Sequence, residues 1–159
     1  MKRYRFINKN GMSVEVTDQG ASLVEVNVPD KDGNLCDVIL GYQKMEEYAT
    51  ETEFFGATVG RNANRIGGAS FTLNGQEYQL EDNNNGNNLH SGLDFYHMRL
   101  WDVKEVTENS IRFVLFSPDG DQGLPGNFDL SVTYTVTDEN GLKITYDGVS
   151  DKDTYVSLT

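Results

Sequence analysis

The chain has 159 residues, of which 37% are hydrophobic and 24% are charged, and its formal net charge at pH 7 is −12. This composition is typical of one globular domain with its own hydrophobic core, and it argues against wholesale disorder. A surface this acidic repels nucleic-acid phosphates and anionic lipids, so we expect neither a nucleic-acid partner nor a membrane partner.

The cellular location is predicted from what the sequence lacks. The basic N-terminus, Met1–Arg5, is not followed by the apolar stretch of a signal peptide, and no apolar run has the length of a membrane span. Cys36 is the only cysteine, so an intrachain disulfide is excluded. We expect a cytoplasmic protein in which Cys36 is a small buried apolar group.

Hydrophobic side chains recur mainly with a period of two, which predicts strands. The clearest strand spans residues 130–136, where apolar residues alternate with Ser and Thr, and a turn at 138–141 leads into a return strand. A second hairpin spans residues 69–80. Its Asn-Gly pair favours a two-residue turn that places Phe71 opposite Tyr78.

Further short strands complete an all-β pattern. They are predicted at residues 3–8, 12–17, 22–28, 35–40, 100–106 and 111–116. The last of these is nearly continuous in apolar character and predicts a strand covered on both faces. Only residues 43–49 favour a helix, of one or two turns. The fold class is therefore an antiparallel β-sandwich or barrel, and with no interdomain linker we expect residues 1–159 to form a single region.

Two loops carry an unusual set of polar side chains. Residues 56–68 hold Asn64 and Arg65 among glycines, and residues 87–92 hold His90. The hydroxyls of an uncharged sugar both donate and accept hydrogen bonds, so a sugar pocket needs planar polar side chains in fixed places. From these residues alone, structural roles stay open. Arg65 could pair with a surface carboxylate, Asn64 could cap a turn, and His90 could be a turn or core histidine.

Other functional motifs fail on inspection. Asp119 and Asp121 resemble the start of a calcium loop, but the twelfth position is Leu130, where an EF-hand needs a glutamate. The two histidines and one cysteine have no zinc spacing, and no glycine loop has a nucleotide-binding context. We expect no metal and no cofactor, and a structural role for His97.

The polar motifs occur in a distinctive order. They are Gly60-Arg61-x-Ala63-Asn64-Arg65-Ile66, the Phe-x-Leu-Asn-Gly-x-x-Tyr-x-Leu hairpin, Asn88-Leu89-His90-x-Gly92, Trp101-Asp102, and Ser117-Pro118-Asp119-Gly120-x-x-Gly123-x-Pro125-Gly126. This ordered set resembles the aldose 1-epimerases across essentially the whole chain. The resemblance implies the amino-terminal half of a galactose mutarotase-like supersandwich. It also implies an enzyme that interconverts the α and β anomers of free hexoses such as galactose or glucose.

The resemblance also implies a role for each candidate residue. Arg65 matches the family's sugar-binding arginine, and Asn64 matches an asparagine that contacts substrate in some members. His90 matches the first active-site histidine, which hydrogen-bonds the sugar and supports ring opening. Ser91 and Leu124 depart from the family pattern, where a glycine and an aromatic residue are usual, and neither change removes a functional group.

Family members are about twice as long as this chain. Their general acid is a histidine after a Val-x-Leu-Thr strand, and their general base is a glutamate, both of which we expect beyond Thr159. We therefore expect the 159 residues alone to be inactive, and to self-associate or to pair with a carboxy-terminal half. The alternative is a non-catalytic carbohydrate-binding module on the same scaffold. An epimerase for phosphorylated sugars is disfavoured by the acidic charge.

Overall fold

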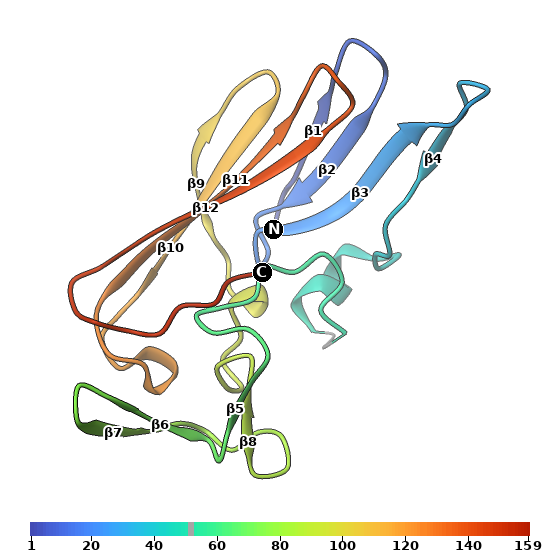
Figure 1. The fold of residues 1–159 in the computed structure, drawn as a ribbon. Helices are drawn as coiled ribbons and strands as arrows, with labels where there is room; N and C mark the ends of the chain where they lie inside the picture. The colour runs from blue at the N-terminus through green and yellow to red at the C-terminus, as the bar shows by residue number, and fades with distance from the viewer. Residues whose placement is uncertain (51–52) are drawn as a thin grey trace. The chain divides into compact units, whose positions relative to one another are not determined.

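The computed structural model describes residues 1–50 and 53–159, and its regular structure is almost entirely β (Figure 1). One four-stranded sheet has the order β1-β2-β3-β4, and a second has the order β12-β11-β10-β9. The strands of the first sheet are β1 (Arg3–Ile7), β2 (Ser13–Thr17), β3 (Ser22–Pro29) and β4 (Leu35–Asp37), and all neighbours are antiparallel. The strands of the second are β9 (Asp102–Val106), β10 (Ser110–Ser117), β11 (Phe128–Val136) and β12 (Leu142–Ser150).

Four short strands form two further pairs. β5 (Arg65–Gly67) pairs with β8 (Asn87–Leu89), and β6 (Ser70–Leu73) pairs with β7 (Gln76–Gln79). The helical segments are single 3-10 turns: η1 (Met45–Ala49), η2 (Tyr96–Met98) and η3 (Asp121–Gly123). The prediction of an all-β fold built from antiparallel strands is confirmed. None of the helices within the described residues has the length and apolar character needed to cross a membrane.

The chain divides into two compact units. The first unit comprises residues 1–57, 97–115 and 131–147, and the second comprises 58–96, 116–130 and 148–159. Strands β10, β11 and β12 contribute residues to both units. The prediction that residues 1–159 form one domain stays a prediction.

The core of the first unit lies between side chains of the two four-stranded sheets. Val14 and Val16 of β2 are fully buried, as are Phe113 of β10 and Val132 of β11. Tyr134 of β11 is also buried, and its hydroxyl donates to the backbone oxygen of Ala21 at 2.7 Å. Alternate residues of β2, β10 and β11 therefore point into one apolar layer, as the period of two requires.

The hairpin predicted at residues 69–80 is confirmed in register. Phe71 of β6 lies opposite Tyr78 of β7, and their rings are stacked with centroids 5.1 Å apart. Asn74 and Gly75 have φ angles of 53° and 79°, the left-handed values that a two-residue type I′ turn needs. Local sequence alone was sufficient to predict this element.

Two predictions of burial are wrong. β10 was expected to be covered on both faces, yet Phe116 is 56% exposed because only alternate side chains of the strand, including Ile111 and Phe113, reach the core. Cys36 was expected to be buried, but it is exposed. It lies on β4, the edge strand of its sheet, and all three residues of that strand are exposed.

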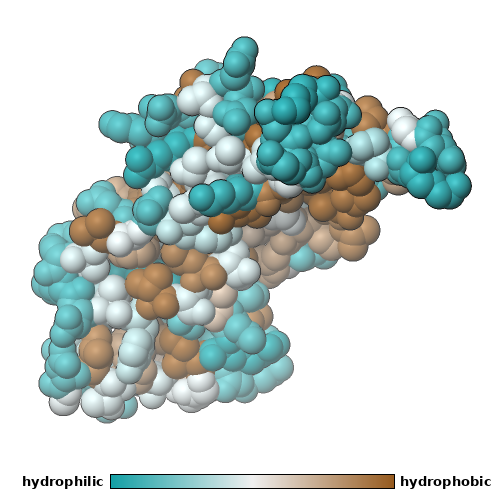
Figure 2. All heavy atoms as spheres, turned by 45° about the horizontal axis from the view of Figure 1, so that its top comes forward, coloured by the Kyte–Doolittle hydropathy of each residue, from teal (hydrophilic) through white to brown (hydrophobic). Residues whose placement is uncertain are grey.

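Hydrophobic groups remain at the surface, and Figure 2 shows several of them among hydrophilic residues on one face. On β12, the edge strand of its sheet, Ile144 and Val149 are 41% and 71% exposed. An unpaired strand edge with apolar side chains is a template for pairing with another strand. The expected self-association, or pairing with a carboxy-terminal half, stays a prediction.

The second unit is organised around a buried arginine. The side chain of Arg61 is fully buried, and its guanidinium donates to the backbone oxygens of Pro125 and Gly126, both at 3.0 Å. It also donates to the hydroxyl of Ser117 at 2.6 Å and lies 5.2 Å from the ring centre of Phe128. A buried charge is tolerated only when it is hydrogen-bonded, and these acceptors supply that compensation.

The segment that contains Arg61 is held by a second set of contacts. Residues 59–63 exchange backbone hydrogen bonds with residues 157–159, from Val59 to Thr159 at 2.7 Å and from Ala63 to Ser157 at 2.7 Å. The chain that leads to Asn64 is thus fixed on both its side-chain and its backbone groups.

We predict that Arg61→Ala lowers the free energy of unfolding by about 3 kcal/mol or more, because several buried carbonyl oxygens lose their donor together. Arg61→Lys should rescue only part of this loss, since one ammonium group cannot reach the same acceptors. Urea denaturation measures both. Arg112→Ala, at an exposed position of β10, is the control. Equal stabilities of the Arg61 and Arg112 variants would contradict a central role for Arg61.

Candidate functional site

Strand pairing brings the two polar loops together. β5 and β8 run antiparallel, with Arg65 opposite Leu89 and Gly67 opposite Asn87. The sequence did not predict these strands, because each has only three residues and is rich in polar side chains and glycine. Their pairing places the residues just outside the ladder, Asn64 and His90, next to each other.

Asn64 and His90 are joined by two hydrogen bonds. The backbone N–H of Asn64 donates to Nδ1 of His90 at 3.0 Å. The backbone N–H of His90 donates to the backbone oxygen of Asn64, also at 3.0 Å. Both residues have positive φ angles, 64° and 52°, a conformation in which Asn and His are enriched among non-glycine residues. The site is therefore fixed by backbone geometry as well as by side chains.

These contacts determine which nitrogen of His90 carries a proton. Because Nδ1 accepts a hydrogen bond, the neutral imidazole has its proton on Nε2. Burial lowers the pKa of His90, and the positive charge of Arg65 lowers it further. A proton on Nδ1 would also face the N–H of Asn64. His90 is thus a neutral hydrogen-bond donor at physiological pH.

Arg65 is exposed, in contrast to Arg61. Its Nε donates to Oδ1 of Asn84 at 2.8 Å, and one terminal nitrogen lies 3.4 Å from Oδ1 of Asn64. Within residues 1–50 and 53–159, Arg65 makes no ion pair. A guanidinium has five N–H donors, and the others make no hydrogen bond to the described part of the chain. They can donate to a ligand.

Sequence reasoning missed the residues that support the site. The buried hydroxyl of Ser91 accepts from the backbone N–H of Asn62 at 2.8 Å and donates to its oxygen at 3.1 Å. Ser91 was noted only as a departure from the family's glycine. Asn84 lies in an asparagine-rich stretch, residues 82–88, and that unusual composition was the available signal.

His97 belongs to the first unit, whereas Asn64, Arg65 and His90 belong to the second. It is only 4% exposed, its ring contacts that of Phe54 with centroids 4.6 Å apart, and its backbone oxygen accepts from Gln19. This environment agrees with the structural role expected for it. Among the residues that the structure describes, no three His, Cys, Asp or Glu side chains are grouped as metal ligands would be.

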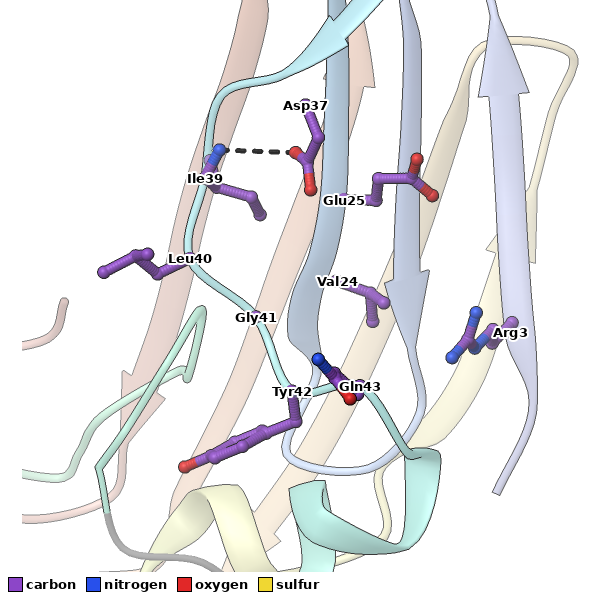
Figure 3. A pocket seen from close by; sticks show the side chains of 9 residues that line it. All are labelled: Arg3, Val24, Glu25, Asp37, Ile39, Leu40, Gly41, Tyr42 and Gln43. Atoms are coloured by element: carbon purple, nitrogen blue, oxygen red, sulfur yellow. Dashed lines mark hydrogen bonds between the residues drawn. The ribbon is translucent and has the colours of Figure 1, made fainter.

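A separate hollow of about 360 Å³ lies in the first unit beside β3 and the chain after β4 (Figure 3). None of the predicted site residues lines it. Its carboxylate at Asp37 accepts the backbone N–H groups of Val26 and Ile39 at 3.0 and 3.3 Å. That side chain holds the end of the strand in place, which is a structural task.

Comparison with known proteins gives a consistent result. A family model described as aldose 1-epimerase matches residues 2–159. The chain is 47% identical to an aldose 1-epimerase of Haemophilus influenzae over 152 residues. These aligned residues make up 96% of this chain and 44% of that protein. The chain is 38% identical over 153 residues to a galactose mutarotase of Sus scrofa, with the same two coverages. The chain therefore spans less than half the length of these curated relatives.

Solved structures give the same answer for the fold. A GalM/aldose epimerase homologue from C. elegans has a TM-score of 0.94 and 32% sequence identity, over 99% of this chain and 48% of that one. A galactose 1-epimerase from Lactobacillus acidophilus has a TM-score of 0.83 and 30% identity, over 99% of this chain and 51% of that one. The predicted galactose mutarotase-like fold is confirmed.

We predict that His90 titrates below the ordinary value of 6.5 and that its proton at pH 7 is on Nε2. Because the folded pKa is the lower one, the unfolded chain takes up the proton first as the pH falls below 6.5, and stability is lost toward the folded pKa. NMR titration of the imidazole gives both the midpoint and the tautomer. His90→Gln should lose this contribution to the pH dependence of unfolding. A midpoint above the ordinary value would contradict the geometry.

Proposed function

The chain belongs to the aldose 1-epimerase family, and we propose that it supplies the sugar-binding part of a site that interconverts the anomers of a free hexose such as galactose or glucose. The observation that supports this most directly is the pair of hydrogen bonds between Asn64 and His90. These bonds bring an imidazole beside a guanidinium that has no carboxylate partner within the described residues. Such a group of fixed planar donors suits the hydroxyls of an uncharged sugar.

Each residue has a distinct role in this proposal. The guanidinium N–H groups of Arg65 donate to hydroxyl oxygens of the sugar, and its charge stabilises an oxygen that gains negative charge as the ring opens. The Nε2–H of His90 donates to a second sugar oxygen. The side-chain amide of Asn64, which lies 3.4 Å from the Arg65 guanidinium, can both donate and accept.

Ring opening also requires proton transfer in both directions. One group must protonate the ring oxygen while another removes the proton of the C1 hydroxyl, and reclosure after rotation gives the other anomer. A guanidinium does not accept a proton, and Nδ1 of His90 is already hydrogen-bonded to Asn64. We therefore propose that the acid and the base, a histidine and a glutamate by family resemblance, come from outside these 159 residues.

A second candidate function rests on the same observation. Asn64, Arg65 and His90 form hydrogen bonds but include no ready proton acceptor, which also suits a non-catalytic carbohydrate-binding module. Both proposals require that the chain binds a hexose. They differ in whether the addition of the remaining half produces turnover.

The 159-residue chain should therefore have negligible mutarotase activity on its own. Polarimetry on freshly dissolved α-D-glucose measures this against a buffer blank. Addition of a carboxy-terminal half from a homologous epimerase should restore a rate if the chain is half of an enzyme, and should not if it is a binding module. A rate well above the blank for the chain alone, abolished by His90→Ala, would refute the proposed division of the site.

Arg65→Ala should weaken hexose binding by about 10- to 100-fold, since a hydrogen bond to a charged group contributes about 1.5–3 kcal/mol. The melting temperature should stay near that of the wild type, because the side chain is exposed. Titration with galactose, followed by NMR, measures the affinity. Arg112→Ala is the matched control, an exposed arginine of β10 outside the site. Wild-type affinity in the Arg65 variant would rule out its sugar-binding role.

A further inference from the structure

The asparagine-rich stretch before β8 forms a tight, well-held turn. Asn84 and Asn87 exchange two backbone hydrogen bonds, at 3.0 and 3.1 Å, around Asn85 and Gly86. These two central residues have φ angles of 53° and 82°, as in a type I′ turn. The carboxylate of Asp82 accepts the N–H of Gly86 at 2.9 Å. The backbone of Asn84 is thus rigid without help from its own side chain.

The same stretch is tied to the strand that carries His90. The side-chain oxygen of Asn83 accepts the N–H of Leu89 at 2.7 Å, and its amide donates to the oxygen of Leu89 at 2.9 Å. The side-chain amide of Asn83 thus satisfies the same two backbone groups of Leu89 that a neighbouring strand would bind. The turn that carries Asn84 therefore has a fixed position relative to β8.

From this position Asn84 contacts the guanidinium. Its Oδ1 accepts the Nε–H of Arg65 at 2.8 Å. This hydrogen bond is shorter than the 3.4 Å contact between the same guanidinium and Oδ1 of Asn64. A long exposed arginine side chain has considerable rotamer freedom, and ligand binding must otherwise overcome the loss of that freedom. With Nε bonded to this rigidly held acceptor and one terminal nitrogen near Asn64, the remaining N–H groups make no hydrogen bond to the described residues.

We propose that Asn84 is a positioning residue, which holds the guanidinium of Arg65 in the orientation that binds the sugar beside His90. This inference rests on the proposed function and adds to it a residue from a loop that had no assigned role. The amide suits the task because it is a neutral acceptor, which orients the guanidinium without neutralising its charge. A carboxylate at the same place would form an ion pair and compete with the sugar.

The direct test follows the Nε–H of Arg65 by ¹⁵N NMR in the 159-residue chain. Asn84→Ala should speed the exchange of this proton with water. Asn85→Gly is the matched control, since glycine accepts the positive φ of that position and the side chain of Asn85 makes no hydrogen bond in the described residues. The control should exchange as the wild type does. Unchanged exchange in Asn84→Ala, in a protein that keeps its folded spectrum, would overturn the proposal.

The NMR titration midpoint of the His90 imidazole provides a second readout. It would not change if Asn84 had only a structural role in its turn. Burial lowers the pKa of His90, and the positive charge of Arg65 lowers it further. The carboxylate of Glu81, which accepts the N–H of Leu93, is the same in every variant. Asn84→Ala should raise the midpoint, because the positive charge of Arg65 is then no longer held beside the imidazole. Asn84→Asp should raise it further. In an Arg65→Gln background, Asn84→Ala should have no effect.

Titration with galactose separates this inference from the proposed function. Asn84→Ala should weaken binding by about 2- to 10-fold, the range for the cost of immobilising one flexible side chain on binding, and Asn85→Gly should not. If the wild-type chain binds no hexose while Asn84→Ala still changes the exchange of Arg65, the positioning contact stands and the proposed function fails. If hexose binds with equal affinity to wild type and Asn84→Ala, Asn84 has no positioning role in binding.

Discussion

The hydrogen bonding of the buried guanidinium of Arg61 is the constraint on which the second unit depends. A charge without water is tolerated only where several acceptors surround it, and here backbone oxygens of Pro125, Gly126 and Ser117 converge on one side chain. Three separate parts of the chain thereby meet at one point. The loop that leaves this point carries Asn64 and Arg65 within four residues.

Two arginines in one short loop thus have opposite roles. The terminal nitrogens of Arg61 donate to carbonyl and hydroxyl groups of the protein, and the side chain is fully buried, so it cannot serve a ligand. Arg65, exposed at the start of β5, uses one donor on Asn84 and makes a weak contact with Asn64. A structural arginine that fixes the loop allows a second arginine to retain unused donors, which is the arrangement a preorganised binding site requires.

The imidazole of His90 follows the same logic. Its backbone and its Nδ1 are both bonded to Asn64, so ring orientation and tautomer are set before any ligand arrives. Burial and the neighbouring positive charge keep it neutral by lowering its pKa. These residues together form a rigid set of hydrogen-bond donors, which is the reason for proposing that this chain contributes binding and that proton transfer comes from other residues.

The sequence by itself determined the features that depend on neighbouring residues. The period of two predicted most strands, the Asn-Gly pair predicted the register of Phe71 with Tyr78, and the order of motifs identified the family. It also singled out Asn64, Arg65 and His90, which the structure brings together through β5 and β8.

Only the tertiary structure decided which polar groups are buried and what they contact. Nothing local distinguishes Arg61 from Arg65, because the carbonyl groups that surround Arg61 come from residues more than fifty positions away. Periodicity likewise shows which side chains share a face but not whether that face is covered, so the exposure of Phe116 and Cys36 was mispredicted. The contact of Asn84 with Arg65 depends on a turn held against a short strand, and long-range packing, not local preference, sets that distance.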